Sequence, residues 1–180
     1  MHGRANVSGR PEAGNPRTLL FDACQAPDYL RAPVSKRSAK RRFHVKIPVR
    51  FRDLDPMGHV NNSVYLTYFE VARTAYWQEI HHDYRYDVLD FVVARSECDY
   101  VSAAMLRETV RVEVWLSRIG TSSFALDYEL FDERSERLVA RGKTIQVMID
   151  TRSGRPRPIE PDLRERMRSF AEHWGETPEE

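Results

Sequence analysis

One long helix set among strands is the feature that most constrains how this chain can fold. Apolar side chains recur at three- or four-residue steps between residues 62 and 80, which predicts a helix of about 28 Å at 1.5 Å per residue. The members of this apolar face are Tyr65, Phe69, Ala72, Tyr76 and Ile80. A stripe of that length must be buried against another layer of structure. The rest of the chain therefore has to supply a surface that covers it.

Strands on both sides of the helix supply that surface. Apolar and polar residues alternate there with a period of two, which is typical of half-buried strands. The alternating segments are residues 43–52, 91–100, 110–116, 124–130 and 139–149. Connections between the last three segments are too short for crossover helices, so these strands are antiparallel. We expect an α+β fold in which a five-stranded antiparallel sheet wraps around one long central helix.

Charge and composition divide the chain into three parts. Residues 1–42 contain nine Lys or Arg and three Asp or Glu, a net charge of +6, which predicts a flexible basic extension. Its stretch 35–42 fits a solvated linker or a contact with nucleic acid or another anionic surface. The Arg-containing first 20 residues also allow an organelle transit peptide. We expect one domain over 43–150, followed by a C-terminal linker and a short amphipathic helix over 151–180.

The overall composition argues against several classes of protein. A formal net charge of +1 disfavours a uniformly basic nucleic-acid binder, so no nucleic-acid partner is expected. Two cysteines, Cys24 and Cys98, rule out a disulfide scaffold and a multi-cysteine zinc site, and they fit a reducing compartment. No apolar run approaches the roughly 20 residues of a membrane span, and no charged segment followed by an apolar one opens the chain. We therefore expect a cytoplasmic protein without a membrane span.

A candidate site lies between the first strand and the helix. Asp55 precedes the predicted helix start by seven residues, and Pro56 and Gly58 turn the chain between them. A carboxylate there could attack a carbonyl carbon or take a proton from water. Free N–H groups at the helix start could hold the carbonyl oxygen as it becomes negative. By itself, however, an Asp in a loop rich in Gly and Pro is more often a turn or capping residue.

The sequence around this site resembles the hotdog-fold acyl-CoA thioesterases of the 4-hydroxybenzoyl-CoA thioesterase type. Their pattern stands here as Asp55-x-x-Gly58-His59-Val60-Asn61-Asn62-x-x-Tyr65, continuing into Tyr68-x-Glu70-x-x-Arg73. The resemblance covers roughly residues 43–150. The chain departs from the family at residues 106–109, where Leu-Arg-Glu-Thr stands in place of a Gly-Asp pair that is common in such proteins.

The resemblance implies a hotdog fold and the hydrolysis of an acyl-CoA to a free acid and coenzyme A, without a metal or another cofactor. Asp55 matches the family's catalytic carboxylate, which acts as nucleophile or as base. Asn62 matches the position whose backbone N–H faces the thioester carbonyl. The residues expected to contact substrate are Gly58, His59, Asn61 and Tyr65. A lone loop histidine is also typical of a structural role, and Tyr65 equally suits the core.

The same resemblance implies assembly of the chain. Strands like 91–100 pair across a two-fold axis in the family, which predicts a homodimer or homotetramer with sites at the interface. The coenzyme A phosphates need cations near the site, and the candidates are Arg95, Arg107, Arg118 and Arg141. Two alternatives share this fold: a non-catalytic protein that binds or senses acyl-CoA, and a dehydratase or hydratase, which uses an Asp and a His on a different loop pattern.

Overall fold

The computed structural model describes residues 42–81 and 90–180, so the predicted extension lies almost entirely outside the described residues. The elements follow one another as β1 (Phe43–Pro48), a 3₁₀ turn η2 (Phe51–Asp53), α2 (Asn62–His81), β2 (Phe91–Tyr100), β3 (Thr109–Ile119), β4 (Ser123–Asp132), β5 (Leu138–Met148) and α3 (Pro161–His173). The long helix and the four strands after it stand where the periodicity places them.

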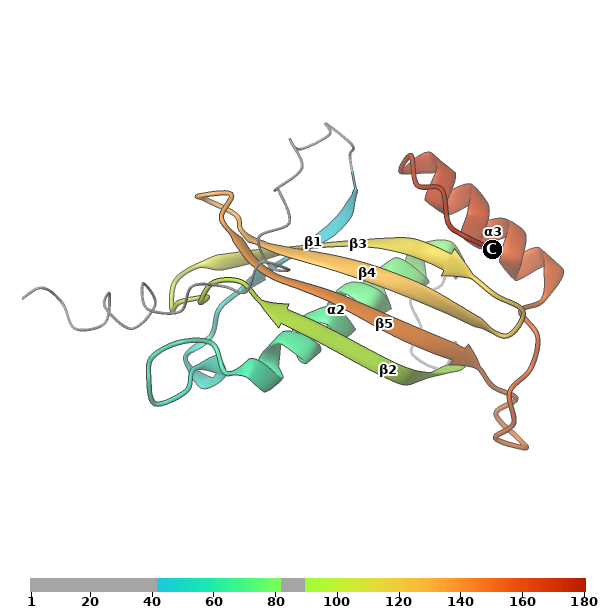
Figure 1. The fold of residues 1–180 in the computed structure, drawn as a ribbon, viewed down its shortest axis with the longest axis horizontal. Helices are drawn as coiled ribbons and strands as arrows, with labels where there is room; N and C mark the ends of the chain where they lie inside the picture. Colours follow the sequence, from blue (N-terminus) through green and yellow to red (C-terminus); the bar gives the residue numbers. More distant parts are fainter. Residues whose placement is uncertain (1–41, 82–89) are drawn as a thin grey trace, which may run out of the picture. The chain divides into compact units, whose positions relative to one another are not determined.

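The five strands form one antiparallel sheet in the order β1-β3-β4-β5-β2. The long helix α2 runs across one face of this sheet (Figure 1). The predicted α+β architecture is therefore confirmed. The strands β1 and β2 are the two edges, and β2 pairs with β5 on one side and with no described strand on the other.

The end of the first strand was predicted wrongly. Alternation suggested a strand through residue 52, but β1 ends at Pro48 and the chain turns at Phe51–Asp53. Proline cannot donate to a strand ladder, and the backbone N–H of Arg50 donates instead to the Asp53 carboxylate at 2.9 Å. Phe51 is consequently 81% exposed rather than packed in the core.

Aromatic packing fixes α2 against the sheet. The ring of Phe69 stacks on Tyr128 of β4 with centroids 4.5 Å apart, and Trp77 stacks on Phe124 at 5.1 Å. Gly142 of β5 makes this approach possible, because a Cβ atom there would lie 2.3 Å from Cζ of Phe69. The sheet therefore holds the middle of α2 tightly, and with it the position of the helix start at Asn62.

The C-terminal residues anchor the other end of α2. Helix α3 buries Leu163, Met167 and Ala171 in the same core. Beyond it, the buried carboxylate of Glu176 accepts hydrogen bonds from the Tyr76 hydroxyl at 3.0 Å and from the Leu116 N–H at 3.1 Å. The boundaries 43–150 and 151–180 stay a prediction, although both segments contribute to this one core.

Charged side chains gather on the sheet face opposite α2 as pairs. Arg141 contacts Glu129 at 3.3 Å and Lys143 contacts Asp127 at 3.2 Å.

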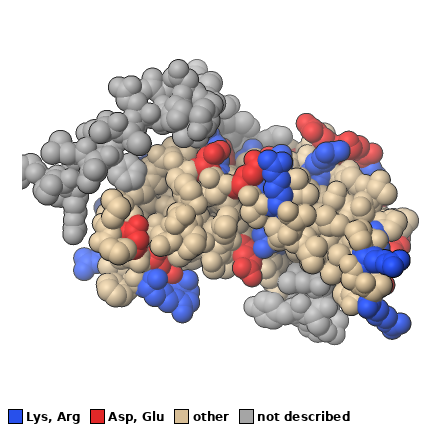
Figure 2. All heavy atoms as spheres, turned by 60° about the horizontal axis from the view of Figure 1, so that its bottom comes forward, with Lys and Arg blue, Asp and Glu red and all other residues tan. Residues whose placement is uncertain are grey.

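The side of the molecule that carries β2 shows charged residues only singly or in small groups, and other residues form most of its surface (Figure 2). Within the described residues, no helix is long and apolar enough to cross a membrane.

Candidate active site

The predicted site is a short loop that folds back on itself before α2. Leu54 and Val60 form an isolated β-bridge, and the N–H of Asp55 donates to the carbonyl of His59 at 2.8 Å. Gly58 turns the chain with φ of +81°, a conformation that favours glycine. This geometry explains why Pro56 and Gly58 follow Asp55: the loop needs a tight reversal there.

The Asp55 carboxylate is half-buried and held by backbone donors. Its Oδ1 accepts hydrogen bonds from the N–H of Met57 at 2.8 Å and of His59 at 3.2 Å. Its Oδ2 makes no hydrogen bond to another described residue. The carboxylate thus has a turn-forming oxygen and a second oxygen whose lone pairs remain available. The bonds to Oδ1 fix the orientation of that second oxygen.

The start of α2 is capped by the residue before it. Asn61 Oδ1 accepts hydrogen bonds from the backbone N–H of Ser63 at 3.0 Å and from its hydroxyl at 2.8 Å. The side chain of Asn61 thereby satisfies one of the free donors of the helix start. The N–H of Asn62 receives no such partner among the described residues. An unpaired N–H at the positive end of a helix is suited to an oxyanion.

The remaining predicted site residues divide between loop and core. His59 is half-buried in the loop and forms a β-bridge with Met105. Tyr65 is only 3% exposed, and its hydroxyl accepts the Ala104 N–H at 3.3 Å. Burial raises the pKa of Tyr65 above its usual value. The structure therefore brings Gly58 and His59 into hydrogen-bonded contact with Asp55, while Asn61 caps α2 and Tyr65 lies in the core.

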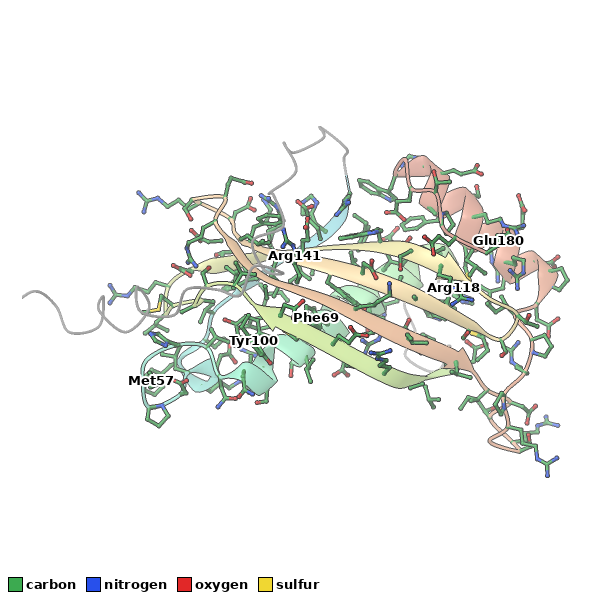
Figure 3. All side chains as sticks on the ribbon, in the orientation of Figure 1. Met57, Phe69, Tyr100, Arg118, Arg141 and Glu180 are labelled. Carbon is green, nitrogen blue, oxygen red and sulfur yellow. The ribbon has the colours of Figure 1, made fainter. Side chains whose placement is uncertain are left out.

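Two tyrosines and an acid around the loop were missed by the sequence prediction. Tyr100, at the end of β2, donates its hydroxyl to the carbonyl of Asn62 at 3.0 Å and is 45% exposed. Tyr100 and Met57 lie toward the same end of the structure (Figure 3). Asp53 is 2% exposed and accepts the hydroxyl of Tyr68 at 3.1 Å. Neither contact follows from local periodicity, because each joins residues far apart in the chain.

The four candidate arginines differ in their ion pairs and in where they lie relative to the site loop. Arg95 pairs with Glu97 at 2.8 Å and Arg141 with Glu129 at 3.3 Å. Arg118 lies beside α3, away from Met57 and Tyr100 (Figure 3). Arg107, by contrast, follows Met105, which bridges His59 of the site loop.

The conformation of Arg107 explains the departure from the family at this turn. Its φ is +75°, in the left-handed region that favours glycine, so the backbone keeps a glycine-like turn with an arginine in it. Arg107 makes no ion pair with another described residue, and it lines a surface hollow of about 500 Å³ together with Arg134 and the acids Glu108, Asp132 and Glu133. The described part of the chain has no cluster of three or more His, Cys, Asp or Glu side chains that could hold a metal ion.

Comparison with known proteins identifies the family. The profile of the Thioesterase-like superfamily matches residues 49–167. An uncharacterized Bacillus subtilis protein, YsmA, is 30% identical over 129 residues, covering 72% of this chain and 87% of that protein. The long-chain acyl-CoA thioesterase FadM of Escherichia coli is 26% identical over 133 residues, covering 69% of this chain and 96% of FadM.

A solved structure agrees with these sequence matches. A thioesterase from Thermus thermophilus, crystallised with coenzyme A and Zn, superposes with a TM-score of 0.68 at 37% identity, covering 74% of this chain and 97% of the other. This chain has the hotdog fold and belongs to the thioesterase-like superfamily.

Proposed function

We propose that this protein is an acyl-CoA thioesterase of the 4-hydroxybenzoyl-CoA thioesterase type, which hydrolyses an acyl-CoA to a free acid and coenzyme A. The observation that carries the proposal is the Asp55 carboxylate, fixed by the N–H groups of Met57 and His59 in a loop that leads into the start of α2. Membership of the superfamily supports it, as do a relative named for acyl-CoA hydrolysis and a related structure with bound coenzyme A.

The chemistry follows from the two ends of this loop. The N–H of Asn62 receives the thioester oxygen as it becomes negative, at the positive end of α2. In one route Oδ2 of Asp55 attacks the carbonyl carbon, the thiolate of coenzyme A leaves, and water then hydrolyses the mixed anhydride. In the other, Asp55 takes a proton from a water molecule that attacks the carbonyl carbon directly. Either route ends with a carboxylic acid and a protonated thiol.

A panel of acyl-CoA thioesters tests the proposal. We expect the full-length protein to release free thiol from at least one aromatic or aliphatic acyl-CoA, measured with a thiol-reactive dye. Uncatalysed hydrolysis in the same buffer is the reference rate. Tight binding of acyl-CoA without thiol release would instead support the non-catalytic alternative. Asp55 argues against that alternative, because a sensor does not need a carboxylate beside the carbonyl.

We also propose that two copies of the chain complete the site by pairing their β2 strands. All ten residues of β2 are exposed or half-buried, and Val92, Val93 and Tyr100 present apolar surface there. An unpaired edge strand is a template for pairing with another strand. Because Tyr100 contacts Asn62, a second chain on β2 would lie directly beside the proposed oxyanion position.

Coenzyme A binding gives a prediction for Arg107. Replacement by alanine should raise the KM for acyl-CoA about tenfold and leave kcat nearly unchanged, because a charge-assisted contact to phosphate is made equally in the ground and transition states. The control is Arg118→Ala, which removes the same charge beside α3. Initial rates across a range of substrate concentrations measure both constants.

Two further comparisons make this prediction specific to the phosphates. A simple thioester without phosphates should show the same KM with the parent and with Arg107→Ala. Added salt should raise the KM of the parent for acyl-CoA and affect the variant less. Equal KM values for the parent and Arg107→Ala would exclude Arg107 from coenzyme A binding.

A further inference from the structure

We infer that Asp53 is a positioning residue for this site, and that Arg50 and Tyr68 act with it. In this arrangement the carboxylate of Asp53 fixes the position of the loop that carries Asp55 relative to the start of α2. The inference rests on the proposed function for its catalytic consequence. Its structural part concerns only how the loop is held.

The first argument is the burial of the Asp53 carboxylate. Its side chain is 3% exposed, and a buried carboxylate is tolerated only when it is paired and hydrogen-bonded. Arg50 supplies its backbone N–H at 2.9 Å, Nε at 3.1 Å and Nη2 at 2.9 Å, and Tyr68 supplies its hydroxyl at 3.1 Å. Burial alone would raise the pKa of Asp53, but these donors outweigh it and hold the pKa below its usual value. The carboxylate is therefore charged at neutral pH.

The second argument is the place of Asp53 in the backbone. Its N–H donates to the carbonyl of Arg50 at 3.0 Å, and its own carbonyl accepts the N–H of Asn61 at 2.8 Å. The residue thus joins both ends of the loop: the chain leaving β1 and the capping residue of α2. Tyr68, about one and two-thirds turns into α2, ties the same side chain to the helix.

The consequence concerns the two groups that the chemistry needs. Asp55 lies two residues after Asp53, and Asn62 follows the residue that Asp53 holds. The relative position of the two groups therefore depends on one junction, formed by the hydrogen bonds of Asp53 to Arg50, Asn61 and Tyr68. A small displacement of reacting groups strongly lowers the rate of the chemical step. Loosening this junction should lower kcat and leave the binding of coenzyme A, which relies on other groups, unchanged.

The helix α2 offers a matched pair of variants. Tyr68 and Tyr76 are both 1% exposed, and each donates its hydroxyl to a buried carboxylate, Asp53 at 3.1 Å and Glu176 at 3.0 Å. Tyr68→Phe should lower kcat about tenfold with KM changed less than twofold. Tyr76→Phe should lower the melting temperature as much as Tyr68→Phe does, but should keep kcat within twofold of the parent. Steady-state kinetics and thermal melts on the full chain measure both.

A second pair of variants tests the carboxylate itself. Asp53→Asn removes the charge that Arg50 and Tyr68 bind. Its control is Glu176→Gln, because Glu176 is 7% exposed and its carboxylate likewise accepts a tyrosine hydroxyl and a backbone N–H, from Tyr76 and Leu116. Asp53→Asn should reduce kcat by about tenfold or more, whereas Glu176→Gln should affect stability alone. Equal losses of kcat within either pair would mean that Asp53 has only a structural role, and would overturn the inference.

Hydrogen exchange gives a readout that does not need activity. The amides of Met57, His59 and Asn61 donate within this loop, so they should exchange about tenfold faster in Tyr68→Phe than in Tyr76→Phe. If the parent releases no thiol from any acyl-CoA, the proposed function fails and the exchange comparison still decides how the loop is held. Unchanged exchange at all three amides would overturn the inference whatever the activity.

Discussion

Replacing Asp55 by asparagine should lower kcat by about 10²–10⁴-fold, because the loss of a nucleophile or general base commonly has an effect of this size. Asparagine keeps the shape of the side chain, and its carbonyl oxygen can still accept the N–H groups of Met57 and His59. Its amide carries no negative charge, so it can neither attack the thioester nor take a proton from water. Thiol release on the best substrate measures the effect, and circular dichroism checks the fold.

Asp150 provides the matched control for this substitution. It is a turn aspartate like Asp55: its Oδ1 accepts the N–H groups of Arg152 at 3.1 Å and Ser153 at 2.7 Å in the loop after β5. Asp150→Asn therefore makes the same chemical change in the same kind of turn, away from α2. It should keep kcat within twofold. If Asp55→Asn retains activity within threefold of the parent, Asp55 has no part in the mechanism.

The fold could be predicted largely because its signals are local. The helix was predicted from Asn62 to Ile80 and runs from Asn62 to His81. Period-two alternation located the four later strands, whose inward residues pack on α2. The error at the end of β1 has a physical cause that periodicity does not contain: the Asp53 side chain binds the Arg50 backbone and turns the chain.

The site was predictable only where its residues are neighbours in the sequence. Asp55, Gly58, His59 and Asn62 lie within eight consecutive residues, so a motif can identify them together. Tyr100 is 38 residues from Asn62, and its contact depends on how β2 pairs with β5. Tyr68 belongs to the family motif, but its hydrogen bond to Asp53, 15 residues earlier, depends on how the loop packs on α2. The four arginines likewise differ only in register and turn conformation.

Disrupting the free edge of β2 should have the second-largest effect. Light scattering on the parent should show a mass of at least two chains. In the double variant Val92→Lys and Val93→Lys the mass should fall to one chain, because charged side chains would replace the apolar surface of that edge.

Activity per chain should fall at least tenfold in the same variant if the partner strand completes the site beside Tyr100 and Asn62, since a site left open to water loses the electrostatic advantage of its N–H donors. Thr121→Lys, in the exposed turn between β3 and β4, makes one such change from a β-branched residue to lysine away from this edge and should keep both mass and activity. A parent that is a monomer with full activity would exclude an interface site. A monomeric double variant with undiminished kcat would show that Asp55, Asn62 and the loop between them work within a single chain.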